Sequence, residues 1–303
     1  MFGKFFSFPP TLHTYHADGR RPLEDLYSAY STLVETHGWM METIYTQENN
    51  LPIIVFSTQK KGPAFWIIAG IHGEEPAGPN AIAENISLIA ELGKKIPVLL
   101  LPMCNPSGYM RDWRYPNERR DWRLGRSVSD SEYFLLSKEN PFLPRKKEVA
   151  SKEAFALTSK ILERVKTHPP LITIDHHEDE ALHEAYIYSQ GKMGAHDPVA
   201  QKTIEILLDS EIPVQMSGTT RFGEEIVNGI IGPVSDGSVD ELLSSEKIIV
   251  NGHVVPGPSS HTSLVIETPT QHTPLKKRIA AHANIILAYE EFSQVLLSNS
   301  PTV

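Results

Sequence analysis

The residue types best suited to chemistry occur in three short groups of histidine and carboxylate side chains. Each group follows a short apolar run, and the groups are His72 with Glu75, residues 175–180, and Glu267. Short continuous apolar runs are typical of strands that are buried on both faces of a parallel sheet. In open α/β sheets, the crevice beyond the carboxyl ends of the strands binds ligands. We therefore expect these three groups, although far apart in the sequence, to converge on one edge of a sheet.

The first group lies on a turn between a strand expected over residues 65–69 and a helix expected to begin at Pro76. Proline is tolerated there because the first position of a helix needs no backbone N–H. Imidazole and carboxylate are zinc ligands, and two histidines with one glutamate leave a fourth position open, as in catalytic zinc sites. We therefore interpret His72, Glu75 and one histidine of residues 175–180 as a zinc site, against the alternative of a solvated turn.

The other carboxylates have separate roles in this interpretation. Asp175 could orient a ligand histidine from behind, and Glu267, near the metal but outside the ligand set, could act as a general base. His176 and His177 are adjacent, so their side chains should point to opposite faces of a strand. His176 is expected to point away, although a swap of ligand between the two stays open here. The remaining carboxylates of these groups, Glu74 and residues 178–180, are expected to be mainly solvated, although Glu178 could support a ligand from behind.

The rest of the chain alternates helical and strand-like patterns around these groups. Helices are expected over residues 23–36, 76–93, 147–166, 198–208 and 275–297. Further strands are expected over residues 41–45, 53–57, 98–103, 186–188, 248–250 and 253–255. Residues 105–109 are expected to form a turn, and Asn251-Gly252 a hairpin turn. This alternation predicts a single α/β domain over residues 1–303, a sandwich with a largely parallel sheet flanked by helices.

Composition narrows the classes of function. The 37 acidic residues outnumber the 28 basic ones, which gives a formal net charge of −9 and argues against non-specific binding to nucleic acid or an anionic membrane. The single cysteine, Cys104, excludes an intrachain disulfide and fits a reducing compartment. Residues 1–10 lack the apolar core and cleavage site of a secretory signal, and no apolar run is long enough to span a membrane. We therefore expect a soluble, cytoplasmic protein.

Five short motifs, in order, resemble the zinc carboxypeptidase family in the broad sense that includes the succinylglutamate desuccinylase and aspartoacylase branch. The family pattern is His-x-x-Glu after a strand, Asn-Pro-x-Gly, an arginine-bearing loop, Asp-x-His at a later strand, and a Glu at the last core strand. Here these read His72-Gly-Glu-Glu75, Asn105-Pro-Ser-Gly108, Trp122-Arg123, Asp175-His-His177 and Ile266-Glu267-Thr-Pro269. Each motif alone is short, so the order and spacing carry the resemblance.

The resemblance implies a central mixed, largely parallel sheet of eight strands flanked by helices. It implies that His72, Glu75 and His177 are the zinc ligands. It also implies that Glu267 is the base and that Arg123 is the electrophile that stabilises the oxyanion. These roles agree with activation of water by zinc and a base, and with fixed charges around the oxyanion. Six arginines lie between Arg111 and Arg126. We expect one or two of them to contact the substrate, and the loss of Arg111 or Arg114 to be mild.

Departures from the family pattern bear on the substrate. Peptide-cleaving members usually carry an Asn-Arg pair that binds the terminal carboxylate of the substrate, and residues 125–133 contain no such pair. Arg126 could substitute for it, whereas Asp130 and Glu132 would favour a cationic or amine-bearing group. Asn105, in the second motif, is also expected to contact the substrate.

The sequence thus predicts a zinc-dependent hydrolase that cleaves an amide or peptide bond of a small peptide or an N-acyl amino acid. A desuccinylase-like or aspartoacylase-like amidohydrolase is the alternative among enzymes. A non-catalytic binding protein that retained zinc is the alternative from another class, and the presence of Glu267 argues against it, because inactive relatives tend to lose the base. A nucleic-acid binder using the arginine-rich loop is disfavoured by the acidic balance of the chain.

Overall fold

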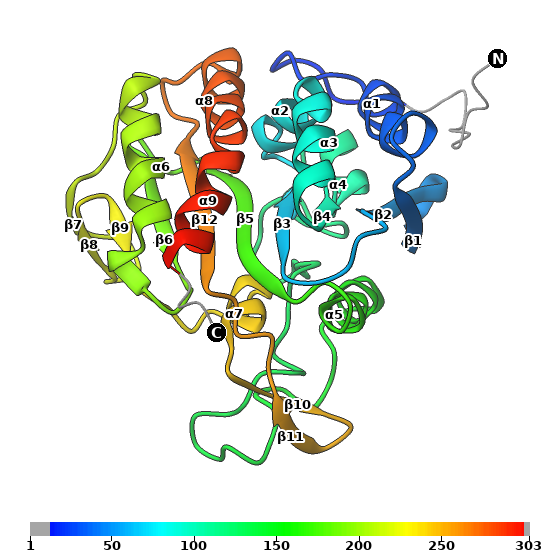
Figure 1. Ribbon diagram of the computed structural model, residues 1–303, viewed down its shortest axis with the longest axis vertical. Helices are drawn as coiled ribbons and strands as arrows, with labels where there is room; N and C mark the ends of the chain where they lie inside the picture. The colour runs from blue at the N-terminus through cyan, green and yellow to red at the C-terminus, as the bar shows by residue number, and fades with distance from the viewer. Residues whose placement is uncertain (1–12, 300–303) are drawn as a thin grey trace.

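A computed structural model describes residues 13–299, which form a ten-stranded mixed sheet and a separate two-stranded hairpin (Figure 1). The sheet strands are β1 (Met40–Gln47), β2 (Leu51–Ser57), β3 (Ala64–Ala69), β4 (Val98–Leu101), β5 (Pro170–Asp179), β6 (Tyr186–Ser189), β7 (Ser217–Thr219), β8 (Glu225–Val227), β9 (Ile230–Ile231) and β12 (Thr262–Pro269). Their order is β1-β2-β4-β3-β5-β12-β6-β9-β8-β7. The central strands β4, β3, β5 and β12 run parallel, and β2 and β6 flank them in the antiparallel direction.

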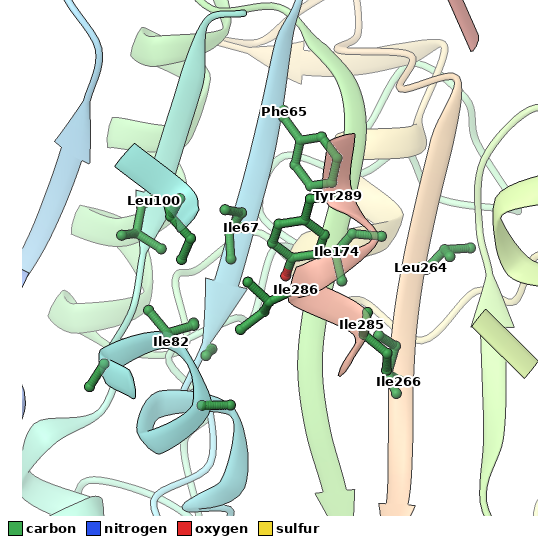
Figure 2. Packing of buried hydrophobic residues seen from close by; sticks show 14 of the residues in the cluster. Phe65, Ile67, Ile82, Leu100, Ile174, Leu264, Ile266, Ile285, Ile286 and Tyr289 are labelled. Carbon is green, nitrogen blue, oxygen red and sulfur yellow. The ribbon is translucent and has the colours of Figure 1, made fainter. Parts of the chain in front are cut away.

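Helices cover both faces of the sheet. Those in the described residues are α1 (Leu23–Glu35), α2 (Ala77–Glu84), α3 (Ile86–Lys95), α4 (Pro106–Arg111), α5 (Lys152–Val165), α6 (Pro198–Asp209), α7 (Val239–Ser244), α8 (Leu275–Leu287) and α9 (Tyr289–Asn299). The larger apolar core lies between one face and α1, α2, α3, α6, α8 and α9, and a smaller one lies between the other face and α5 with α7. Figure 2 shows Ile286 of α8 and Tyr289 of α9 beside Ile67 of β3 in the larger core.

The alternation of side chains along β5 and β12 separates the apolar core from the polar residues. Ile174 of β5 and Ile266 of β12 belong to the larger core (Figure 2). Because successive side chains of a strand point to opposite faces, His177 and Glu267 lie on the other face. The two are adjacent in the parallel ladder between β5 and β12. Both strands continue past His177 and Glu267. These residues therefore lie within the strands, whereas the apolar runs had suggested that they lie beyond the strand ends.

Several expected elements have different boundaries in the structure. The helix expected over residues 76–93 is divided into α2 and α3, because Asn85 leaves helical geometry (φ −114°, ψ 21°). The helix expected over residues 275–297 is likewise divided into α8 and α9. The turn expected over residues 105–109 is the short helix α4, which Asn105 caps. The sheet has ten strands and not eight, because the short strands β7, β8 and β9 extend it beyond β6.

The predicted hairpin forms outside the main sheet. Its strands are β10 (Lys247–Val250) and β11 (His253–Pro256), and the turn residues Asn251 and Gly252 have φ values of 52° and 76°. Positive φ at both positions is what a two-residue hairpin turn requires. Residues 1–10, which lack the features of a secretory signal, lie outside the described part of the chain. Within that part, no helix combines the length and apolarity needed to cross a bilayer.

Candidate metal centre and active site

Three side chains from two parts of the chain converge beside the sheet. His72 and Glu75 lie on the turn between β3 and α2, and His177 lies on β5. His72 Nδ1 is 2.7 Å from Glu75 Oε1, and His177 Nδ1 is 2.8 Å from Glu75 Oε2. One candidate ligand atom from each residue lies within 4.8 Å of the others. Imidazole nitrogen and carboxylate oxygen are ligands that zinc accepts, so the residues present fit this ion.

His177 is oriented by a buried carboxylate on its own strand. Asp175 Oδ2 lies 3.1 Å from His177 Nε2, which leaves Nδ1 directed toward Glu75. A carboxylate on the far nitrogen fixes both the ring and its tautomer. A second carboxylate, Asp240 of α7, joins Asp175 and His177 in a further group of potential ligand atoms within 4.8 Å. Burial, together with the charge of Asp175, raises the pKa of Asp240 well above its usual value.

Residues 72–75, here called the ligand turn, pack backbone against backbone on α4. A Cβ atom added at Gly73 would lie 2.0 Å from the carbonyl carbon of Gly108, so the turn requires glycine there. The buried side chain of Arg20 holds the same junction. Its Nη1 donates to the carbonyl oxygen of Gly73 at 2.9 Å and to that of Tyr109 at 2.7 Å. A residue that precedes α1 therefore ties the ligand turn to α4.

Gly73→Ala is expected to lower the free energy of unfolding by at least about 2 kcal/mol, because the added methyl group must displace backbone atoms. Zinc content should fall with it, since the ligand turn would shift. Gly232→Ala is the matched control, because a Cβ there meets nothing within 4 Å. Denaturant unfolding and zinc analysis of both variants check this. Wild-type stability of Gly73→Ala would show that the ligand turn does not pack on α4 as described.

Glu267 is adjacent to the candidate ligands in the sheet without being one of them. It is paired in register with His177 of β5 and with Tyr186 of β6. Its Oε2 has no hydrogen-bond partner among the described residues. Burial raises the pKa of Glu267 to about 8. A carboxyl group with a pKa near neutrality and an unengaged oxygen is suited to proton transfer.

The arginine that the structure places at the cavity is Arg114. Its Nη1 lies 3.0 Å from Glu74 Oε1 and 3.0 Å from Glu75 Oε1. Burial opposes the charge of Arg114, but these two carboxylates more than offset it and raise its pKa above the usual value. The side chain of Arg123, expected at the site, is 74% exposed and lies 3.6 Å from Asp121. Arg123 therefore lies away from the candidate ligands, because its loop turns it to solvent.

The three residues expected to contact the substrate have different surroundings. Asn105 is buried: its Oδ1 accepts from the N–H of Gly108 at 2.9 Å, and its Nδ2 donates to the carbonyl oxygen of Arg114 at 3.1 Å. It therefore positions Arg114 from behind instead of lining the cavity. Arg126 is exposed and is not among the residues that line the cavity. Asp130 does line it.

His176 faces the helices and not the candidate ligands. Its Nδ1 lies 2.8 Å from His282 Nδ1, and its Nε2 contacts the hydroxyl group of Tyr289. Burial lowers the pKa of His176 to about 4. The alternation of strand side chains thus puts His176 and His177 on opposite faces, as expected, with His177 on the side of Glu75.

Three carboxylates that were expected to be solvated are buried: Glu74, Glu178 and Asp179. Glu178 accepts from the N–H of Ala77 at 2.7 Å and pairs with Arg278, and burial raises its pKa to about 7. Glu74 pairs with Arg114, and burial, together with the charge of Glu75, raises its pKa to about 8. All three are retained inside because each has a guanidinium partner from a distant part of the chain, which for Asp179 is Arg221.

A cavity of about 470 Å³ opens over these residues. One side is formed by the same face of β5, β12 and β6 and includes His177 and Glu267. Other sides come from His72 of the ligand turn, from Arg114, and from two further segments, one a loop and the other running from a loop into α7. The residues that the two segments contribute are Ser127, Ser129 and Asp130, and Asp236, Gly237, Ser238 and Asp240. The rest of the lining is Asp179, Tyr186, Tyr188, Arg221, Phe222, Glu224 and Val265.

Three residues at the site were not identified in the sequence: Arg20, Asp240 and, as a contact of the ligand turn, Arg114. One local signal was available for α7. The Ser238 hydroxyl accepts from the N–H of Glu241 at 3.2 Å, and a Ser-x-x-Glu pattern before an apolar segment marks a helix start. That pattern could have located the helix, but not the face on which Asp240 lies.

Comparison with known proteins gives a consistent assignment. The zinc carboxypeptidase family model matches residues 26–249. No curated protein matched. Similar solved structures include a candidate metallopeptidase from Shewanella baltica OS155 (TM-score 0.69, 19% identity, covering 89% of this chain and 91% of that one). They also include a candidate metallopeptidase from Shewanella amazonensis SB2B (TM-score 0.67, 21% identity, covering 87% of this chain and 90% of that one). A third is bovine thrombin-activatable fibrinolysis inhibitor in complex with tick carboxypeptidase inhibitor (TM-score 0.60, 14% identity, covering 93% of this chain and 98% of that one). At these identities the structures show a shared fold.

Proposed function

Because the chain belongs to the zinc carboxypeptidase family, we propose that it is a zinc-dependent hydrolase that cleaves an amide bond in a small peptide or an N-acyl amino acid. One observation carries this proposal. The donor atoms of His72, Glu75 and His177 converge beside a cavity in which the carboxylate of Glu267 has an unengaged oxygen. Three protein ligands leave a coordination position open, which is the pattern of catalytic zinc sites.

The reaction divides among residues of the candidate metal centre and its cavity. His72, Glu75 and His177 would hold zinc, which supplies a Lewis acid for the substrate carbonyl and for water. Glu267 accepts a proton from the attacking water as the water oxygen bonds to the carbonyl carbon. It then donates that proton to the leaving nitrogen as the carbon–nitrogen bond breaks, so the products are a carboxylic acid and an amine. Asp175 keeps His177 Nδ1 directed at the site.

Arg114 is proposed to stabilise the negative charge that develops on the carbonyl oxygen. It lines the cavity, and Asn105 holds its backbone while Glu74 holds its guanidinium. A charged donor that is already fixed in place need not reorganise as the charge develops. This role replaces the one expected for Arg123, whose side chain is exposed.

The purified protein is expected to hold about one zinc ion per chain. His72→Ala and His177→Ala should each lose it, because each removes a donor. His183→Ala, at an exposed histidine outside the site, is the matched control. Elemental analysis after dialysis, with circular dichroism to check folding, measures the effect. If His176→Ala lost zinc while His177→Ala kept it, the ligand assignment would be wrong.

An N-acyl amino acid amidohydrolase is the second candidate within this class. Arg126, the replacement considered for the missing Asn-Arg pair, is exposed and does not line the cavity. That stretch of the chain therefore offers no anchor for the free carboxylate that a dipeptide and an N-acyl amino acid both carry beside the amide, so it does not decide between the two candidates. Values of kcat/KM for dipeptides and for matched N-acyl amino acids, measured on the zinc-loaded protein, separate the two candidates. Zinc binding without hydrolysis of either kind would favour a non-catalytic protein.

A further inference from the structure

The cavity over the metal centre has more negative than positive side chains. Six carboxylates line it, against two guanidiniums, Arg114 and Arg221. Both guanidiniums are already paired. Arg114 contacts two glutamates of the ligand turn. Arg221 binds Asp179 through both nitrogens, with Nη1–Oδ1 at 3.1 Å and Nη2–Oδ2 at 2.7 Å. The other carboxylates of the lining therefore have no guanidinium partner within it.

Two of these carboxylates, Asp130 and Asp236, lie on loop segments that are joined to each other. The N–H of Ser131 donates to the carbonyl oxygen of Gly237 at 2.7 Å, so the segments share a backbone contact. Lys146 is the cation that faces Asp130 from outside the lining. Its Nζ lies 3.4 Å from Asp130 Oδ2, its side chain is half exposed, and it also pairs with another carboxylate. The charge of Asp130 is thus only partly compensated.

A third carboxylate, Asp240, extends this surface into the buried part of the cavity. Asp240 is 3% exposed, and its Oδ1 has no hydrogen-bond partner among the described residues. The side chain of Asp240 otherwise hydrogen-bonds to Asp175, a second carboxyl group, and a buried carboxylate is costly without a partner of opposite charge. A positive group entering the cavity would supply the missing partner. We call Asp130, Asp236 and Asp240 the acidic wall.

The lining also offers a surface for an aliphatic stem. Tyr186 and Tyr188 of β6 lie edge to face, with ring centroids 5.5 Å apart, and both line the cavity. The hydroxyl group of Tyr188 donates to Glu224, another lining carboxylate, at 2.9 Å. Aromatic faces attract cations as well as apolar groups. Aromatic rings close to carboxylates suit a ligand with a methylene chain that ends in a positive charge.

We propose that the substrate carries an ammonium or guanidinium group on an aliphatic stem, and that this group binds at the acidic wall while the amide bond lies at the metal centre. This specificity rests on the proposed hydrolase function and selects among its substrates. A neutral group at the same place would leave carboxylates of the wall unpaired, and an acidic group would place like charges together, so both are disfavoured.

The test compares lysine with norleucine, which has a similar unbranched stem but no ammonium group. Matched dipeptides and N-acyl amino acids, with one or the other residue on either side of the amide, are assayed on the zinc-loaded protein. The lysine compound of the cleaved pair is expected to have a kcat/KM at least about tenfold higher, which corresponds to one charge-assisted contact. Equal or faster cleavage of the norleucine compound would overturn the proposal.

Variants of the acidic wall locate the effect. In Asp236→Asn and in Asp130→Asn, the lysine-to-norleucine ratio is expected to fall several-fold, and in the double variant, which keeps only Asp240 of the wall, it should fall further than in either single variant. Asp209→Asn is the matched control, because Asp209 is exposed at the end of α6 and does not line the cavity; its ratio should equal that of the wild type. A wild-type ratio in the double variant would contradict the assignment of the wall.

A measurement of ligand binding tests the cation site separately from the hydrolase function. Free L-lysine and L-norleucine are titrated into the zinc-loaded wild-type protein in a calorimeter, with lysine expected to bind at least about tenfold more tightly. If no amide compound were cleaved but lysine bound preferentially, the proposed hydrolase function would fail and the cation site would stand. If the two amino acids bound equally, the cation site would fail whether or not the protein hydrolyses amides.

Discussion

Replacing Glu267 by glutamine is expected to lower turnover at least about a hundredfold, the usual scale of general-base catalysis, while the protein keeps its fold and its zinc. Glutamine has nearly the same size but cannot accept a proton from water. The fold should persist because Glu267 Oε2 has no hydrogen-bond partner among the described residues, so the change removes no contact of that oxygen. The position within β12 also fixes the side chain beside His177 in either variant.

The measurement is amide hydrolysis together with zinc content, for wild type and Glu267→Gln side by side. Glu225→Gln serves as the control, because Glu225 is exposed and does not line the cavity. Unchanged turnover in Glu267→Gln with zinc retained would contradict the proposed mechanism. Loss of zinc in Glu267→Gln would instead make Glu267 a ligand.

Arg114→Ala is expected to lower kcat by roughly two to three orders of magnitude, the range found when an oxyanion donor is removed. Arg123→Ala should have little effect, because that side chain is 74% exposed and outside the cavity. This reverses the ranking that the sequence suggested, in which Arg123 was the electrophile and the loss of Arg114 was mild. The reason is the contact of Arg114 with Glu74 and Glu75, which only the structure shows.

Zinc content must be followed in the Arg114 variants, because the guanidinium also balances the two glutamates of the ligand turn. Arg114→Lys keeps the positive charge but loses the planar donor geometry, so it should retain zinc and recover only part of the activity. Equal losses in Arg114→Ala and Arg123→Ala would point to a general electrostatic effect. A larger loss in Arg123→Ala would mean that its loop closes over the cavity during the reaction.

The central strands and their histidine and carboxylate groups could be predicted, because the burial of a strand is indicated by its own local sequence. Each central parallel strand is a short apolar run, and alternation along β5 is enough to separate His176 from His177. The placement of one arginine among six was not predictable in this way. Arg114 and Arg123 lie in a stretch of weak periodicity, and the choice between them depends on a pairing with Glu74, forty positions away in the chain.

Buried carboxylates were the other failure of local reasoning. Glu74 and Glu178 were expected to be solvated because charged side chains are rarely buried without partners. Their partners, Arg114 and Arg278, come from distant segments, and the separation of Glu178 from Arg278 is 100 residues. Asp240 was missed for a related reason, since its buried position depends on how α7 packs against β5. The pairing of a buried carboxylate with an arginine from a distant segment is a property of the assembled fold and cannot be read from the local sequence.

The place of β12 between β5 and β6 has a consequence for how the protein is made. β5 and β6 are consecutive in the chain but are not neighbours in the sheet. The edge of each strand that pairs with β12 therefore stays unpaired until β12, which comes much later in the chain, has been synthesised. Unpaired edges can template association with other chains, and late long-range pairing slows folding. All three candidate metal ligands precede this step, whereas Glu267 arrives with β12 itself. During synthesis, the three candidate ligands can therefore come together before the proposed base is in place, so metal binding would precede the proposed hydrolytic activity.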